Sequence, residues 1–133
     1  MDNSVDYLST IQKAEVKNLR EWTKRHFIPP IAEHGFSMPV LIYDGNKLHS
    51  ILFDAGSSPN GVVTNARRMG INLAEMEGVE LSHGHYDHFG GLPAIVKAVN
   101  KNDLPIIVHE DMFKIRSVAN TEGTVRRYPL FPT

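Results

Sequence analysis

Four side chains that can bind metal ions lie within six residues, in the pattern His83-x-His85-x-Asp87-His88. Imidazole and carboxylate groups suit zinc, iron or manganese. Alternate residues of an extended segment point the same way, so His83 and His85 can reach one cation together. Asp87 and His88 come from the following turn and can face a second cation. This spacing arises by chance in only about one chain in a thousand of this kind, and it predicts a site for two divalent metal ions.

The alternative interpretation of this cluster is a solvated loop, or a set of histidines that only form structural hydrogen bonds. The chain contains no cysteine, which excludes disulfides, thiolate metal sites and a cysteine nucleophile. Any metal must therefore be held by histidine or carboxylate side chains. Such a donor set fits an open catalytic site better than a closed structural zinc site.

Strands and helices alternate along the chain, and the histidine cluster follows one of the strands. The apolar, partly β-branched runs predict four strands, the first two joined as an antiparallel hairpin by Asp44-Gly45-Asn46: residues 38–43, 49–54, 79–82 and 104–108. Apolar residues at helical spacing predict helices at residues 7–27, 59–69, 92–99 and 110–118. We expect Ser58 to cap the second helix and Gly70 to end it. This order indicates an α/β fold, in which ligands gather at strand ends.

Smaller signals complete the expected organisation. Asn72 has the spacing of a cap for a short helical turn. Gly84 is expected to let the backbone pass close to the metal ions. Residues 1–133 are read as a single domain with an irregular tail at 120–133.

Residues 81–92, with the sequence LSHGHYDHFGGL, resemble the metal-binding signature of the metallo-β-lactamase superfamily. Residues 32–37, 51–56 and 65–73 resemble one archaeal and bacterial branch of it. That branch includes the dihydropterin (ribofuranosyl)aminobenzene phosphate synthases. The likeness covers roughly residues 33–116.

The resemblance implies an αβ/βα sandwich of two halves with a dinuclear site in the cleft between them. It places His83 and His85 on the first metal, and Asp87 and His88 on the second, with Asp87 as the catalytic residue that orients the attacking water. Asp54 would fix the tautomer of a ligand histidine. The alternative for Asp54 is a strand-end aspartate that closes a turn onto backbone N–H groups.

Compared with the family pattern, the chain resembles only an N-terminal half. The family's further ligands, a histidine, a bridging aspartate and a last histidine, belong to the second half. We therefore expect half of a sandwich, with a mixed sheet and helices on one face. The expected cofactors are two divalent metal ions, zinc first and iron or manganese as alternatives, with doubtful occupancy of their sites in this chain. An apolar sheet face should be exposed or covered by a homo-oligomer or a complementary C-terminal half.

The expected function is that of a metal-dependent hydrolase-type enzyme, in which activated hydroxide attacks an ester, a phosphoester or a pterin-phosphate-type small molecule. The alternative is a non-catalytic fragment or assembly module that needs a second chain. A redox role with iron is a weaker possibility. The roles of His34 and His109 stay open, with turn capping for the first and lining of the cleft for the second.

Composition limits the partners and the location. A formal net charge of −1 argues against nucleic acid held by bulk electrostatics. The sequence contains no apolar run long enough to span a membrane, and its first residues lack the basic and apolar regions of a signal peptide. We therefore expect no membrane partner and a cytoplasmic location.

Overall fold

The computed structural model describes residues 28–128 and 130–131 of the chain. The helix expected at residues 7–27 lies outside the described residues. The elements follow one another as β1 Met38–Asp44, β2 Lys47–Phe53, α2 Gly61–Met69, η1 Leu73–Glu75, β3 Gly78–Glu80, α3 Tyr86–Phe89, α4 Leu92–Val99, β4 Ile106–Ile107, η2 Glu110–Phe113, β5 Ser117–Ala119 and β6 Val125–Arg127. The two η elements are 3₁₀ helices.

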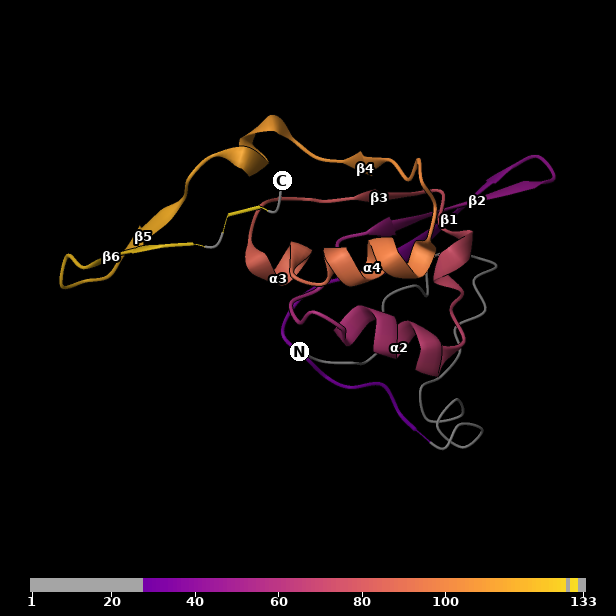
Figure 1. The fold of residues 1–133 in the computed structure, drawn as a ribbon, viewed down its shortest axis with the longest axis horizontal. Helices are drawn as coiled ribbons and strands as arrows, with labels where there is room; N and C mark the ends of the chain where they lie inside the picture. The colour runs from indigo at the N-terminus through magenta and orange to yellow at the C-terminus, as the bar shows by residue number, and fades with distance from the viewer. Residues whose placement is uncertain (1–27, 129, 132–133) are drawn as a thin grey trace.

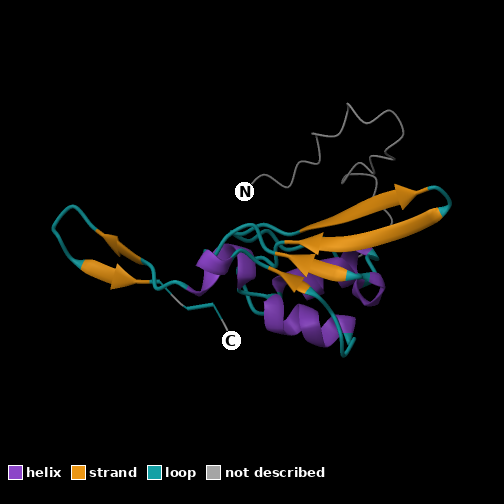
Figure 2. Ribbon diagram, turned by 90° about the horizontal axis from the view of Figure 1, so that it is seen from above, coloured by secondary structure: helices purple, strands orange, loops and turns teal. Residues whose placement is uncertain are grey.

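The predicted hairpin is confirmed. β1 and β2 pair antiparallel from Met38 opposite Phe53 to Asp44 opposite Lys47. Gly45 has a φ of 59° in the connecting turn, a conformation that glycine adopts at little cost. The hairpin extends well beyond the helices (Figure 2).

β3 and β4 complete a mixed four-stranded sheet in the order β1-β2-β3-β4, with β3 parallel to both neighbours. The crossovers carry α2 and α4, which lie on the same face of the sheet (Figures 1 and 2). Since parallel strands run the same way, the segments after Phe53, Glu80 and Ile107 all begin at one edge. The predicted α/β class, with a mixed sheet and helices on one face, is confirmed.

The core fills the space between the sheet and its helices. Leu52, Val79 and Ile95 are at most 1% exposed. α2 ends as predicted at Gly70, whose backbone is in the left-handed conformation and whose N–H donates to the carbonyls of Ala66 and Arg67. The side chain of Asn72 caps η1 through the N–H of Ala74, also as predicted.

The other face of the sheet carries no helix in the described part of the chain (Figure 2). Side chains alternate between the faces of a strand, and the register therefore places Val40 and Ile42 of β1 on this face with Ile51 and Phe53 of β2. Ile42 is 48% exposed and Ile107 of β4 is 55% exposed. The sheet thus presents an apolar surface, the outer face, that these residues define.

Two expectations about the C-terminal region are wrong. The helix expected at 110–118 is only a 3₁₀ helix, η2, after which β5 begins at Ser117. The tail expected to be irregular at 120–133 contains β6, which pairs antiparallel with β5. The β-branched Val118 and Val125 favour strands, and Gly123, at φ 82°, permits the turn between them. Pairing across that turn outweighs the weak helical periodicity.

The cap expected at Ser58 is also not what the structure shows. The residue before α2 is Asn60, and no side chain caps the helix there. The Ser58 hydroxyl donates instead to the carboxylate of Glu33.

Of the described helices, none is long and apolar enough to cross a bilayer.

Candidate functional site

The predicted site residues gather at the edge where the parallel strands end. Asp54 follows β2, and His83 and His85 lie on the loop that follows β3. Asp87 and His88 stand on α3, a single helical turn that begins at Tyr86. The sequence predicts a turn here, and the structure shows that this turn is helical. The turn reverses the chain and directs Asp87 and His88 back toward the strand ends.

His83 and His85 form a close pair. The Nε2 atom of His83 lies 3.0 Å from the Nδ1 atom of His85, and the rings meet edge to face at 4.5 Å. The other nitrogen of His83, Nδ1, is 2.9 Å from the hydroxyl of Ser82. Desolvation and the nearby imidazoles of His88 and His85 lower the pKa of His83 below its ordinary value. A neutral imidazole is the form that binds a metal ion.

Asp54 orients His88 from a buried position. Its carboxylate is 1% exposed, and its Oδ2 atom accepts from His88 Nδ1 at 2.7 Å. Because a carboxylate only accepts, the proton lies on Nδ1 and the lone pair of His88 lies on Nε2. Asp54 itself has a φ of 61°, a left-handed conformation that aspartate tolerates better than most residues.

The same carboxylate also binds the segment that follows β3, 28 positions along the chain. Asp54 Oδ1 accepts from the N–H of Ser82 at 2.8 Å, and Oδ2 accepts from the Ser82 hydroxyl at 2.8 Å. Asp54 therefore contacts a histidine and a backbone N–H, but that N–H belongs to a distant segment and not to a turn at the end of β2. Ser82 connects Asp54 with His83, a role that the sequence interpretation did not assign although Ser82 directly precedes the cluster.

Asp87 lies between two histidines. Its Oδ2 atom is 3.2 Å from His34 Nε2 and 3.6 Å from His88 Nε2. The backbone supports this approach, because Phe36 donates its N–H to the carbonyl of Asp87 at 3.2 Å. The sequence leaves the role of His34 open, and the structure places it beside Asp87. Because His34 is far from the cluster along the chain, the local sequence pattern does not predict this contact.

The donors fit a metal ion in type and in pairwise spacing, but they do not complete a site. Two ligand atoms of one tetrahedral zinc ion are about 3.3–3.4 Å apart, given bonds of about 2.0–2.1 Å. The His83–His85 separation of 3.0 Å is close to that value. Within the residues that the structure describes, however, no three His, Asp or Glu side chains are grouped so that they could hold a metal ion.

A cavity of about 320 Å³ adjoins the His83–His85 pair. Its opposite wall comes from the segment after β4 and includes His109, Asp111 and Arg116. His109 lines the cavity, as considered from the sequence, and also caps η2 by accepting the N–H of Asp111 at 3.2 Å. Arg116 is a neighbour of the site that sequence reasoning missed.

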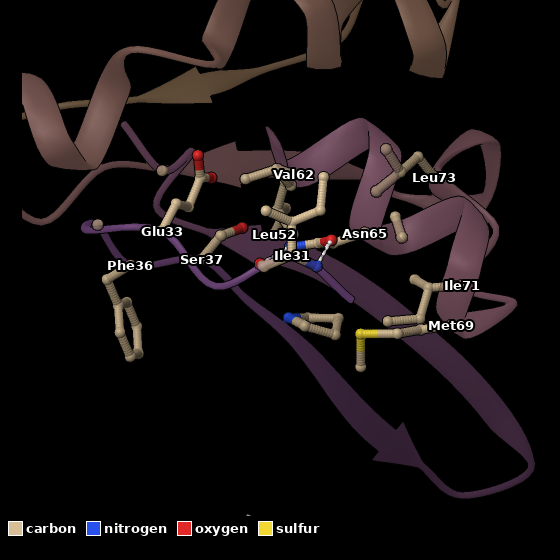
Figure 3. A pocket seen from close by; sticks show the side chains of 14 residues that line it. Ile31, Glu33, Phe36, Ser37, Leu52, Val62, Asn65, Met69, Ile71 and Leu73 are labelled. Atoms are coloured by element: carbon tan, nitrogen blue, oxygen red, sulfur yellow. Dashed lines mark hydrogen bonds between the residues drawn. The ribbon is translucent and has the colours of Figure 1, made fainter. Parts of the chain in front are cut away.

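A second cavity, of about 190 Å³, lies apart from the histidines, between α2 and the segment that leads into β1. Its lining is mostly apolar, as Figure 3 shows for Leu52, Val62 and Ile71. Asn65 bonds to both backbone groups of Ile31 at 2.8 Å there. This cavity lacks the clustered histidines of the site at the strand ends.

Comparison with known proteins gives consistent results. A family model described as the metallo-beta-lactamase superfamily matches residues 19–126. The 7,8-dihydropterin-6-methyl-4-(beta-D-ribofuranosyl)-aminobenzene-5'-phosphate synthase of Methanocaldococcus jannaschii is 28% identical over 115 residues, which are 86% of this chain and 39% of that protein. An uncharacterized protein of the same organism is 42% identical over 95 residues, which are 67% of this chain and 32% of that protein.

Two solved structures are similar to parts of the chain. A B3 metallo-beta-lactamase with an active-site glutamic acid matches with a TM-score of 0.43 and 21% identity, over 85% of this chain and 46% of that one. A metallo-beta-lactamase of Cronobacter sakazakii with a HARLDQ motif matches with a TM-score of 0.42 and 23% identity, over 56% and 29% respectively. The chain spans less than half of the length of each of these four proteins.

Proposed function

Because the chain belongs to the metallo-beta-lactamase superfamily, we propose that it is a hydrolase-type enzyme whose metal ligands are His83, His85, Asp87 and His88. One observation carries the proposal. The buried Asp54 carboxylate holds His88 with its Nε2 lone pair available, at the same sheet edge where His83 and His85 bring two ring nitrogens to 3.0 Å. Histidines oriented by carboxylates are a recurring feature of metal sites in proteins.

Each residue has a distinct role in this proposal. His83 and His85 would hold one cation, and Asp87 and His88 would hold a second. When bound, divalent ions, zinc first and iron or manganese as alternatives, supply Lewis-acid polarisation of the substrate and lower the pKa of a water molecule. Asp87 would accept a hydrogen bond from the attacking water, and Asp54 keeps His88 in the Nδ1-protonated tautomer.

We propose that a second polypeptide segment supplies the remaining ligands. Two donors for each metal ion are too few for tight binding, and the outer face of the sheet is an apolar surface without a described partner layer. A complementary C-terminal half or a second copy of the chain would cover this face. The substrate would be a small molecule with an ester, phosphoester or pterin-phosphate-type group, since one relative is named as a synthase of a dihydropterin phosphate.

A second candidate is a non-catalytic module that assembles with another chain. The observation in its favour is the absence of a three-ligand group among the residues described by the structure. The two candidates differ in whether the assembled chain binds metal ions and turns over a substrate.

Metal binding by the assembled protein tests the proposal. We expect elemental analysis and calorimetry to find zinc bound to the wild-type chain, in its oligomer if not in its monomer. His83→Gln and Asp87→Asn should each lower the affinity at least tenfold. Asp103→Asn is the control for loss of a carboxylate, because Asp103 is exposed in the turn after α4, away from the cluster. No bound transition metal at saturating zinc, in monomer and oligomer alike, would overturn the catalytic proposal.

A further inference from the structure

We propose that Arg116 is a positioning residue for the His83–His85 pair. The proposal rests on the function proposed above, because it assigns these two histidines to one metal ion. Arg116 lies in the segment between η2 and β5, 32 positions along the chain from Gly84. Its guanidinium fixes the peptide that joins the two histidines.

The guanidinium bridges two segments of backbone. Its NH1 group donates to the carbonyl of Gly84, and its NH2 group donates to the carbonyl of Asp111 at 2.5 Å. A planar guanidinium with fixed donor directions constrains the orientation of its partners more than a flexible ammonium group does. The carbonyl of Gly84 belongs to the peptide that leads directly into His85. Holding this carbonyl therefore restricts where the imidazole of His85 can lie.

The absence of a side chain at Gly84 leaves room for the guanidinium of Arg116. A Cβ atom on residue 84 would overlap the Arg116 guanidinium, with NH1, Cζ and NH2 as its nearest atoms. Gly84 was expected to be small so that backbone could approach metal ions, and the structure gives a different reason. The missing side chain leaves the space that the guanidinium occupies.

The β5–β6 hairpin supports Arg116 and contacts His85 as well. The carbonyl of Arg116 accepts the N–H of Tyr128 at 2.9 Å. The ring of Tyr128 lies 5.6 Å from the imidazole of His85, with an angle of 31° between the planes. Arg116 therefore acts on the backbone before His85 while Tyr128 packs against its side chain. These contacts limit the rotation that would separate His83 Nε2 from His85 Nδ1.

The first test measures zinc affinity and metal-free geometry in matched variants. Arg116→Ala should weaken zinc binding about 10–100-fold, the range seen when groups that orient metal ligands are removed. Arg116→Lys should recover only part of the loss, because an ammonium keeps the charge and three donors but lacks the fixed donor directions of a planar guanidinium. Arg127→Ala, which removes the same charge from the neighbouring strand β6, should leave the affinity unchanged. In the metal-free protein, imidazole NMR contacts between His83 and His85 should weaken in Arg116→Ala and persist in Arg127→Ala.

The second test is a double-mutant cycle that isolates the contact. Gly84→Ala should lower Tm in the wild-type background, because the new methyl group displaces the guanidinium from its two carbonyl acceptors. The same change should lower Tm less in Arg116→Ala, where the space is free. Equal Tm losses in the two backgrounds would show that Arg116 does not occupy this space.

The outcomes separate the two proposals. If the wild-type chain binds no zinc, the proposed function fails, and the metal-free NMR contacts and the cycle still decide the role of Arg116. If zinc binds and Arg116→Ala changes neither its affinity nor the His83–His85 contacts, the positioning role is wrong. A variant that is too unstable for calorimetry is replaced by Arg116→Gln, which keeps two N–H donors for the Gly84 carbonyl and should show an intermediate loss of affinity.

Discussion

His88 donates its Nδ1 proton to Asp54 across 34 positions of sequence, at 2.7 Å, and Asp54 is almost completely buried. This one contact connects the end of β2 with the first turn after the histidine loop. It decides which nitrogen of His88 is available for a ligand. The same carboxylate also binds the backbone and hydroxyl of Ser82.

Replacing Asp54 by asparagine should change the tautomer of His88. The amide can keep one acceptor for Ser82 but turns an NH2 donor toward His88 Nδ1, so the imidazole proton should move to Nε2. We expect zinc affinity to fall about 10–100-fold and the free energy of unfolding to fall by about 1–3 kcal/mol. Imidazole nitrogen NMR and denaturant unfolding measure the two effects.

Asp103→Asn, an exposed site in the turn after α4, is the control for charge loss. Because asparagine tolerates positive φ about as well as aspartate, backbone strain at position 54 does not confound the comparison. A variant that retains the Nδ1-protonated tautomer would contradict the role of Asp54.

His83 should titrate below the ordinary histidine pKa of about 6.5. Burial is the largest cause of the lowered pKa of His83, and the imidazoles of His88 and His85 lower it further. The carboxylates of Asp54 and Asp87 oppose the shift. His88→Gln should raise the pKa of His83 toward the ordinary value, and the distant change His49→Gln should leave it unaltered. An NMR titration of the metal-free protein measures both.

The direction of this shift also predicts how stability depends on pH. Since the pKa of His83 is lowered in the folded state, the unfolded chain binds more protons as the pH falls through about 6.5. The contribution of His83 to stability is complete above that pH and decreases below it. Denaturant unfolding at several pH values should show a smaller decrease in His83→Gln than in the wild type. An equal decrease in the two proteins would contradict the expectation.

Self-association should depend on one face of β1. Ile42 and Leu41 are neighbours with similar exposure, 48% and 55%, but they point to opposite faces of the sheet. Ile42→Lys places a charge on the outer face and should weaken a dimer about tenfold or more, since burying an unpaired charge is costly. Leu41→Lys should leave association intact. Sedimentation velocity compares the variants, and a wild-type chain that is monomeric at all concentrations would contradict a second copy on this face.

The C-terminal end of α2 offers a test of local structure alone. Gly70 has a φ of 71°, and a Cβ atom there would meet nothing within 4 Å. Gly70→Ala should therefore cost about 1–2 kcal/mol through backbone strain without any clash. Gly70→Asn should cost less, because asparagine adopts left-handed conformations more readily. Thermal unfolding measures both, and equal losses would point to an effect other than backbone conformation.

Features that depend on neighbouring residues could be predicted from the sequence. The β1–β2 hairpin follows from two apolar runs around a turn that contains Gly45, and the end of α2 follows from Gly70. The region after β4 could not be predicted in this way. Its local pattern resembles a helix, but Val118 and Val125 belong to strands whose pairing outweighs that weak preference.

By itself, the sequence determined that imidazole and carboxylate groups gather within six residues after a strand, and that an α/β fold carries them. These properties follow from composition and from periodicities of a few residues. Only the tertiary structure decided which distant side chains hold the cluster: Asp54 on His88, His34 beside Asp87, and Arg116 on Gly84. The physical reason is that such contacts arise where strand order and crossovers bring separate segments to one sheet edge. The spacing of residues within one segment does not predict contacts with another segment.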